Sequence, residues 1–108
     1  MPELNSEHIN RLERFAAAGF SIIAFPMYGS AVGVRKGSCA ALLEPMPGGG
    51  FSLVGSPSYL IGGNLSVRIH DAQGEWFVFK SKRVEANPAR LREVAAIECE
   101  IKTLLKAP

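Results

Sequence analysis

Apolar residues near the start of the chain recur at helical spacing and predict a helix over Leu4–Ala18. The stripe consists of Ile9, Leu12 and Ala16. Asn5 suits the N-cap position, because its side chain can accept a free N–H of the first turn. Gly19 can adopt the left-handed conformation that ends a helix, with Phe20 in reach of Phe15 as in a Schellman motif. The segment therefore carries both a start signal and a stop signal.

Between residues 20 and 63 the pattern changes to short apolar runs separated by glycine, proline and serine, which predicts short strands. The expected strands are Phe20–Phe25, Ala31–Arg35, Ser38–Leu43, Phe51–Val54 and Tyr59–Ile61. Lys36-Gly37 suits a tight hairpin turn. Gly62-Gly63 indicates a sharp bend or bulge. The intervening segments 45–50 and 55–58 are expected to be loops.

The segment 64–80 predicts a β-hairpin with the sequence DAQG as its turn. If DAQG is the whole turn, His70 faces Glu75, and this pair fixes the cross-strand partners of the residues further from the turn. Ile69 lies opposite Trp76, Val67 opposite Val78, and Leu65 opposite Lys80. One face is then apolar, and we expect it to pack against the core, with Leu65, Val67, Ile69, Trp76 and Val78. The other face carries Ser66, Arg68, His70, Glu75, Phe77 and Phe79.

A second amphipathic helix is predicted from Asn87 to about Leu105, after a short strand extension at Val84–Ala86. Asn87 as N-cap followed by Pro88 is a strong start signal. Apolar residues then follow 3-4-3 spacing. The stripe consists of Leu91, Val94, Ile97, Ile101, Leu104 and Leu105. This stripe is wider than one small sheet needs, so its surplus is the candidate interface of a two-fold dimer.

The predicted order is a helix, six or seven short strands and a second helix. Strands that follow one another without an intervening helix pair antiparallel. We therefore expect one α+β domain over residues 1–108, with a curved antiparallel sheet and a helix at each end. Short strands closed by a C-terminal amphipathic helix resemble the layout of pleckstrin-homology-like domains, and this resemblance implies a partly open barrel. A shared layout does not fix a function.

Composition excludes several classes of protein. The 108 residues carry a formal net charge of +2, which is too mild to indicate nucleic acid or an anionic membrane as a partner by itself. No apolar run approaches the ~20 residues that a membrane span needs. The apolar segment 15–25 follows acidic as well as basic residues, unlike the core of a signal peptide. We therefore expect a cytoplasmic protein without a membrane partner.

Residues that could carry chemistry are few. Cys39 and Cys99 are far apart and lack CxxC or CxxH spacing, so we expect free thiols and no zinc site. No GxSxG or cysteine-protease motif surrounds a nucleophile, and the glycine-rich segments lack P-loop spacing. The expectation is no enzyme, no cofactor and no metal. The alternative is a small hydrolase or isomerase that uses His70 with Asp71 or Glu75. These three side chains around one turn could also hold a divalent ion weakly, as many hairpin tips could.

Two binding hypotheses remain. The first is a non-catalytic binding or protein-interaction module that forms a homodimer through the C-terminal helix. The second is a site for single-stranded nucleic acid or another anionic ligand, in which aromatic rings stack on bases beside basic side chains. Its candidate residues are Arg68, Phe77, Phe79, Lys80 and Lys82. Solvent exposure of Phe77 and Phe79 distinguishes a binding platform from a buried core.

Overall fold

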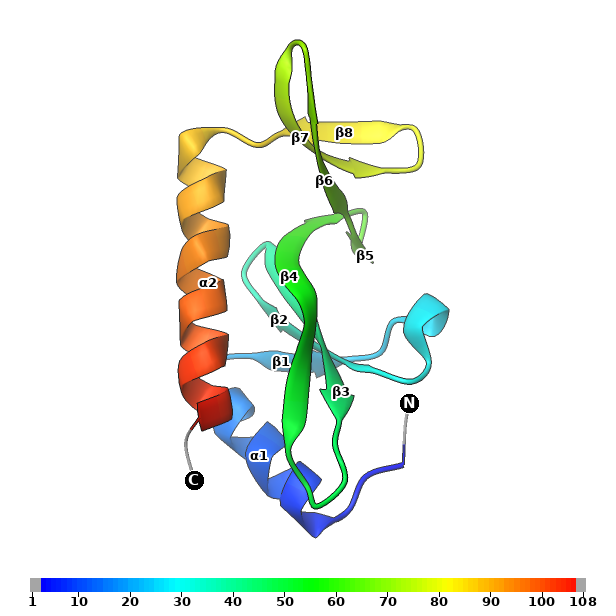
Figure 1. Cartoon of the computed structure of the whole chain (residues 1–108), viewed down its shortest axis with the longest axis vertical. Helices are drawn as coiled ribbons and strands as arrows, with labels where there is room; N and C mark the ends of the chain where they lie inside the picture. Colours follow the sequence, from blue (N-terminus) through cyan, green and yellow to red (C-terminus); the bar gives the residue numbers. More distant parts are fainter. Residues whose placement is uncertain (1–2, 107–108) are drawn as a thin grey trace.

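The structure is a computed structural model that describes residues 3–106. It confirms the predicted α+β class, with a helix near each end and antiparallel strands between them (Figure 1). The helical elements are α1 (Ser6–Ala17), the 3-10 helix η1 (Pro26–Tyr28) and α2 (Pro88–Lys106). The strands are β1 (Ser21–Ile23), β2 (Val32–Lys36), β3 (Cys39–Pro45), β4 (Phe51–Ile61), β5 (Asn64–Leu65), β6 (Val67–Asp71), β7 (Gly74–Phe79) and β8 (Lys82–Glu85).

The strands form two sheets instead of one. Strands β1 to β5 make a five-stranded antiparallel sheet in chain order, and β6 to β8 make a three-stranded sheet. The smaller sheet stands at one end of the molecule, where the β6–β7 hairpin projects beyond the end of α2 (Figure 1). The described chain is accordingly elongated, measuring 46 × 25 × 19 Å.

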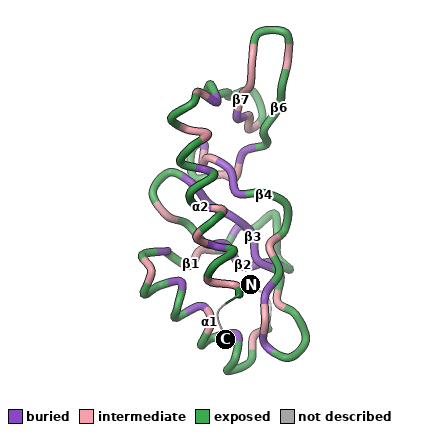
Figure 2. The backbone as a smooth tube through the Cα atoms, turned by 60° about the vertical axis from the view of Figure 1, so that its left-hand side comes forward, coloured by how far each residue is buried: buried purple, intermediate pink, exposed green. Residues whose placement is uncertain are grey.

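The main core lies on one face of the five-stranded sheet. Helix α2 runs along that face against β3 and β4 and meets α1 at its far end (Figure 1). The residues of this core with the lowest exposure include Phe15, Val32, Val34, Cys39, Leu43, Phe77 and Ile101. Figure 2 shows the buried segments concentrated in the strands beside α2, whereas the hairpin tip is exposed.

A smaller core covers the opposite face of the same sheet. Its buried members are Phe25, Ala31, Ala40 and Leu42. The Phe25 ring folds over Gly33, where an added Cβ would come within 2.6 Å of a ring carbon. Ala31, Gly33 and Ala40 are small, so this face has room for the Phe25 ring, which comes just before η1 in the chain. No helix covers this face in the described chain, apart from the single turn of η1.

The ends of α1 confirm the predicted signals. Asn5 caps the helix, accepting the His8 N–H at 3.0 Å, and His8 Nδ1 in turn accepts the Asn5 N–H. At the other end Gly19 has φ 96°, and the Phe20 N–H donates to the Phe15 carbonyl at 3.0 Å. The two phenylalanine rings meet edge to face with centroids 5.4 Å apart. This is the predicted Schellman ending.

Helix α2 also begins as predicted. The side chain of Asn87 accepts the Arg90 N–H at 2.9 Å, and Pro88 is the first helical residue. The helix extends to Lys106, one residue beyond the expected end. It carries the Glu98–Lys102 ion pair at i,i+4 spacing, at 2.9 Å.

One prediction in the middle of the chain was wrong. The segments expected as two strands and a loop are the single strand β4, whose register against β3 shifts between Ala40 and Leu42. Ala40 pairs with Ser58 and Leu42 with Val54, so Ala41 faces a bulge of three residues that contains Gly55 at φ 64°. Proline inside a strand is accommodated at such a bulge, because it cannot donate to the ladder.

The predicted hairpin register is confirmed from Val67–Val78 to Asp71–Gly74. The predicted pair of Leu65 with Lys80 is wrong, because Leu65 pairs with Leu60 of β4. The expected extension at Val84–Ala86 is instead β8, which forms a second hairpin with β7 after a turn at Lys80. Lys80 has φ 55°, a left-handed conformation that non-glycine residues adopt in tight turns.

Candidate interaction surface

The apolar face of the β6–β7 hairpin is turned to solvent, opposite to the prediction. Val67 is 64% exposed and Ile69 is 37% exposed. Phe77, on the other face, is 0% exposed and packs its ring against Tyr59 with centroids 5.0 Å apart. Val67 and Ile69, which were expected in the core, are therefore exposed, and Leu65, Trp76 and Val78 are half-buried. Phe77 belongs to the core, which is the alternative to a binding platform.

Ser66 fixes which face of the hairpin points inward. Its backbone N–H and its hydroxyl both bond to the Tyr59 carbonyl, and its hydroxyl lies 2.8 Å from that of Ser58. Ser66 is buried between β5 and β6. Because side chains alternate along a strand, an inward Ser66 turns Val67 and Ile69 outward. The confirmed register then turns Phe77 inward.

Trp76 is held on the outward face by polar contacts. Its indole N–H donates to Asp71 Oδ1 at 3.1 Å, and the Arg83 guanidinium lies 4.7 Å from the ring centroid. Hydrogen bonds from the Gln73 backbone and from Trp76 lower the pKa of Asp71. These contacts hold the ring on the outward face, where Trp76 is paired with Ile69.

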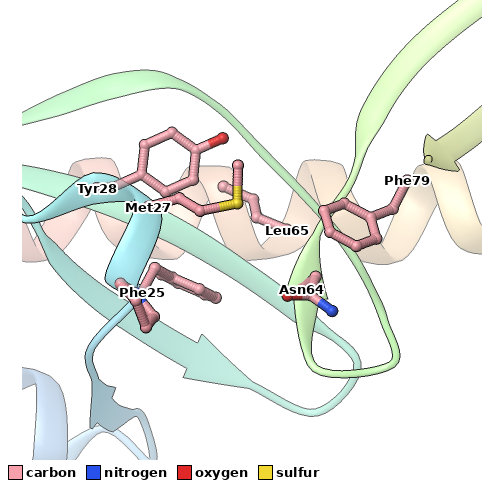
Figure 3. A pocket seen from close by; sticks show the side chains of 7 residues that line it. Phe25, Met27, Tyr28, Asn64, Leu65 and Phe79 are labelled. Carbon is pink, nitrogen blue, oxygen red and sulfur yellow. The ribbon is translucent and has the colours of Figure 1, made fainter.

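An apolar hollow lies next to the hairpin, beside η1. It is formed by η1 and the segments around β5 and β7, with Phe25, Pro26, Met27, Tyr28, Asn64, Leu65 and Phe79 as its lining. Figure 3 shows Met27 and Tyr28 on one side of the hollow and Phe79 on the other. Met27 is 70% exposed and Tyr28 is 38% exposed.

A second hollow connects this region to the hairpin. It lies where β6 parts from β4, and its lining includes Tyr28, Pro57, Leu65, Val67 and Val94. Tyr28 and Leu65 belong to both hollows, so the exposed apolar side chains are continuous from η1 to β6. We name this region the apolar surface and define it by Met27, Tyr28, Leu65, Val67 and Ile69.

The predicted nucleic-acid platform does not form. Phe77 is buried, and Phe79 is half-buried with the Lys80 ammonium 5.5 Å from its ring centroid. Arg68 is paired with Glu75 at 2.7 Å, and Lys82 is exposed at the start of β8. Stacking needs an accessible ring beside free cations, and the inward turn of Phe77 removes the first ring of the pair.

The predicted dimer stripe on α2 lies within the chain's own core. Val94, Ile97 and Ile101 are buried there, and Leu91, Leu104 and Leu105 are half-buried against the same cluster. The expectation of a surplus apolar face was wrong because α2 covers more than the larger sheet: it also meets α1, and its core includes Phe77 of the smaller sheet.

The residues of the catalytic alternative, His70, Asp71 and Glu75, do not assemble into a catalytic group. Asp71 bonds Trp76 and Glu75 bonds Arg68, while His70 is exposed on the hairpin. Burial, reinforced by the charge of Glu93, raises the pKa of Cys39 to about 12 and keeps it a thiol. Within residues 3–106 no three His, Cys, Asp or Glu side chains are grouped to hold a metal ion. No helix of the described chain is long and apolar enough to span a membrane.

Comparisons of the chain with protein-family models, with curated proteins and with solved structures give no match. The candidate surface therefore rests on geometry alone. Sequence patterns missed Met27 and Tyr28, because the single turn of η1 between β1 and β2 is too short to show helical or alternating periodicity.

Proposed function

We propose that the protein is a non-catalytic protein-interaction module whose partner binds the apolar surface. One observation carries the proposal: the large, exposed side chains of Met27, Tyr28 and Val67 line two hollows that share Tyr28 and Leu65, and the exposed Ile69 lies on the same face of the hairpin as Val67. Contiguous exposed apolar surface in a small domain marks interaction sites, whereas isolated exposed apolar residues are ordinary.

The chemistry of the surface supports a protein as the partner. Methionine and tyrosine are enriched at protein interfaces and arginine at their energetic centres. Here Tyr28 and Val67 line the same hollow, and Arg68 and Glu75 are paired on the opposite face of the hairpin. Apolar side chains predominate in the first hollow, and the second also has polar side chains in its lining: Ser56, Ser58, Ser66, Arg68 and Glu98.

If the partner is a second copy of this chain, the proposal becomes one of self-association. The apolar surface replaces the α2 stripe as the candidate contact, because it is exposed in the single chain. Sedimentation velocity of the purified protein over a range of concentrations distinguishes the two forms. A dimer that Val67→Lys dissociates identifies a second copy as the partner.

A photo-crosslinking amino acid at position 67 tests the proposal in the cells that make the protein. We expect a discrete crosslinked partner from position 67 and none from position 9. Ile9 is the matched control, because it is an exposed large apolar residue on α1 at the other end of the molecule (Figure 1).

The purified partner is then titrated against substituted proteins. We expect Val67→Lys to weaken binding at least ~10-fold, because it places a charge in a desolvated contact, and Ile9→Lys to leave binding unchanged. Equal effects of the two substitutions, or no effect of either, would overturn the assignment of the surface.

A further inference from the structure

We propose that the outer edge of β6 pairs with an extended segment of a partner protein in which apolar and acidic residues alternate. This inference rests on the proposed function and specifies how the partner is held. Addition of a strand to an exposed sheet edge is a general mode of peptide recognition, in which backbone hydrogen bonds supply affinity and alternate side chains supply specificity.

The hairpin ladder determines which backbone groups of β6 are free. Asp71 and Gly74 flank a two-residue loop, so they form a hydrogen-bonded pair. Alternation along the antiparallel ladder makes Ile69–Trp76 and Val67–Val78 hydrogen-bonded pairs as well. The N–H and C=O groups of Arg68 and His70 therefore point away from β7, toward the open edge.

Nothing in the described chain occupies that edge. β6 is the end strand of its sheet, and no backbone hydrogen bond joins residues 67–71 to any strand other than β7. The last bond to β4 is from the Ser66 N–H to the Tyr59 carbonyl, immediately before β6. Beyond it the bulge at 55–57 carries β4 away, and the second hollow lies beside Val67 and Arg68.

The edge of β6 carries neither a proline nor a bulge, two of the usual protections against pairing, and the charge that it carries on the inward face, Arg68, is paired with Glu75. Exposed edges are commonly blocked by proline, a bulge, an inward-pointing charge or a covering loop. β6 has the sequence VRIHD, without proline, and its register with β7 is regular over all five residues. Four of these residues are exposed and the fifth is half-buried. An incoming strand would meet two N–H donors and two C=O acceptors on Arg68 and His70.

The side chains of β6 specify the chemistry of the incoming strand. Residues directly opposite in an antiparallel pair lie on the same face of the sheet. Val67 and Ile69, on the outward face, favour apolar side chains across from them. Arg68 and His70, on the other face, favour acidic side chains, which would share the Arg68 guanidinium with its present partner Glu75. The complementary segment therefore alternates apolar and acidic residues.

The same rule disfavours a second copy at this edge. Two-fold antiparallel pairing keeps every side chain on its own face. Arg68 and His70 share a face, so within β6 each can lie opposite only Arg68 or His70 of the other copy. No such register places opposite charges across the pair, and Arg68 opposite Arg68 is repulsive. A different segment can place carboxylates opposite Arg68 and His70, which a second copy of β6 cannot do.

The probe is the synthetic peptide Ac-TVEVEVT-NH2, titrated to millimolar concentration against the isotope-labelled full chain and followed by NMR. We expect chemical-shift changes centred on β6 and slower amide exchange at Arg68 and His70, by ~10-fold or more when the peptide saturates the edge. The peptide Ac-TVKVKVT-NH2 should leave these amides unchanged. Absence of changes in β6 with the acidic peptide, or equal changes with the lysine peptide, would overturn the proposal.

His70→Pro and His70→Gln form a matched pair of variants. Proline removes the outward N–H without touching the inner ladder, and a proline is tolerated at an edge position of this kind, whereas glutamine keeps the N–H. We expect peptide binding to fall ~10-fold or more in His70→Pro and to persist in His70→Gln. If His70→Pro does not fold, a peptide N-methylated at its central valine and glutamates supplies the same test, because it cannot donate to the edge.

The crosslinked partner separates this inference from the proposed function. If Val67→Lys weakens partner binding and His70→Pro does not, the apolar surface stands and edge pairing is overturned. If neither variant weakens binding, both proposals fail.

Discussion

Replacing Phe77 with alanine tests which face of the hairpin is core. Phe77 is 0% exposed and packs against Tyr59 within the cluster that includes residues of α2. Truncation of a fully buried phenylalanine to alanine costs about 3–5 kcal/mol, from lost transfer free energy and the remaining cavity. A domain of this size has about 5–15 kcal/mol of stability in total. Phe77→Ala should therefore remove a large share of it.

Val67→Thr is the matched substitution on the opposite face. Threonine keeps the β-branched shape and the strand preference of valine, so the change tests only whether the side chain is buried. Because Val67 is 64% exposed, its new hydroxyl can bond to water, and we expect stability to change by less than about 0.5 kcal/mol. A buried hydroxyl without a partner would cost about 1–3 kcal/mol.

Urea unfolding followed by circular dichroism measures both variants under the same conditions. The difference in midpoint multiplied by a common slope gives the change in unfolding free energy, provided that the slope stays constant. A cost above about 2 kcal/mol for Val67→Thr, together with a cost below about 1 kcal/mol for Phe77→Ala, would refute the inward placement of Phe77.

Three further predictions concern polar and thiol groups. Cys99 is exposed and Cys39 is buried with its pKa raised to about 12, so Ellman's reagent should titrate one thiol in the native protein and two in denaturant; two native thiols would contradict the burial. The pKa of Asp71 in the folded protein lies below its ordinary value of 3.8. The ionised carboxylate therefore stabilises the fold above pH 3.8, and this stabilisation is lost as the pH falls through the pKa of the folded protein. The single tryptophan, Trp76, should report this as an acid transition in fluorescence with a midpoint below 3.8, absent in Asp71→Asn; a transition that persists in the variant would contradict the assignment. Lys36 donates to the Ala18 carbonyl and pairs with a carboxylate of α2, so Lys36→Met should cost about 1 kcal/mol in urea unfolding, since the group is half-exposed; no measurable cost would show that solvent replaces both contacts.

Local signals in the sequence predicted the parts of the fold that depend on a few neighbouring residues. The Asn5 cap, the Gly19–Phe20 ending and the Asn87-Pro88 start each follow from hydrogen bonds within one turn of helix. The hairpin register likewise follows from its turn. These features form wherever the residues occur, because their partners lie close in sequence.

The candidate surface depended on contacts that local patterns do not contain. The hairpin carries apolar residues on one face and two phenylalanines among polar residues on the other, so the rest of the fold decided which face is buried. The deciding contact is between Ser66 and Tyr59, two polar groups whose pairing no hydrophobic pattern indicates. Met27 and Tyr28 are exposed for a related reason, because the ring that fills the small core is their neighbour Phe25.

The open edge of β6 follows from the same contacts that divide the strands into two sheets. If the hairpin continued the sheet beyond Ser66, β4 would pair with β6 and cover the outward groups of Arg68 and His70. The bulge at Gly55 to Pro57 instead bends β4 at the point where β6 begins. Bulges are used to end pairing and redirect strands, and here the bend leaves an unpaired edge beside an exposed apolar face. Removing the bulge would let β4 pair with β6, which would make the sheet continuous and would cover the proposed binding edge. A continuous sheet and an open edge therefore make opposite demands on residues 55–57.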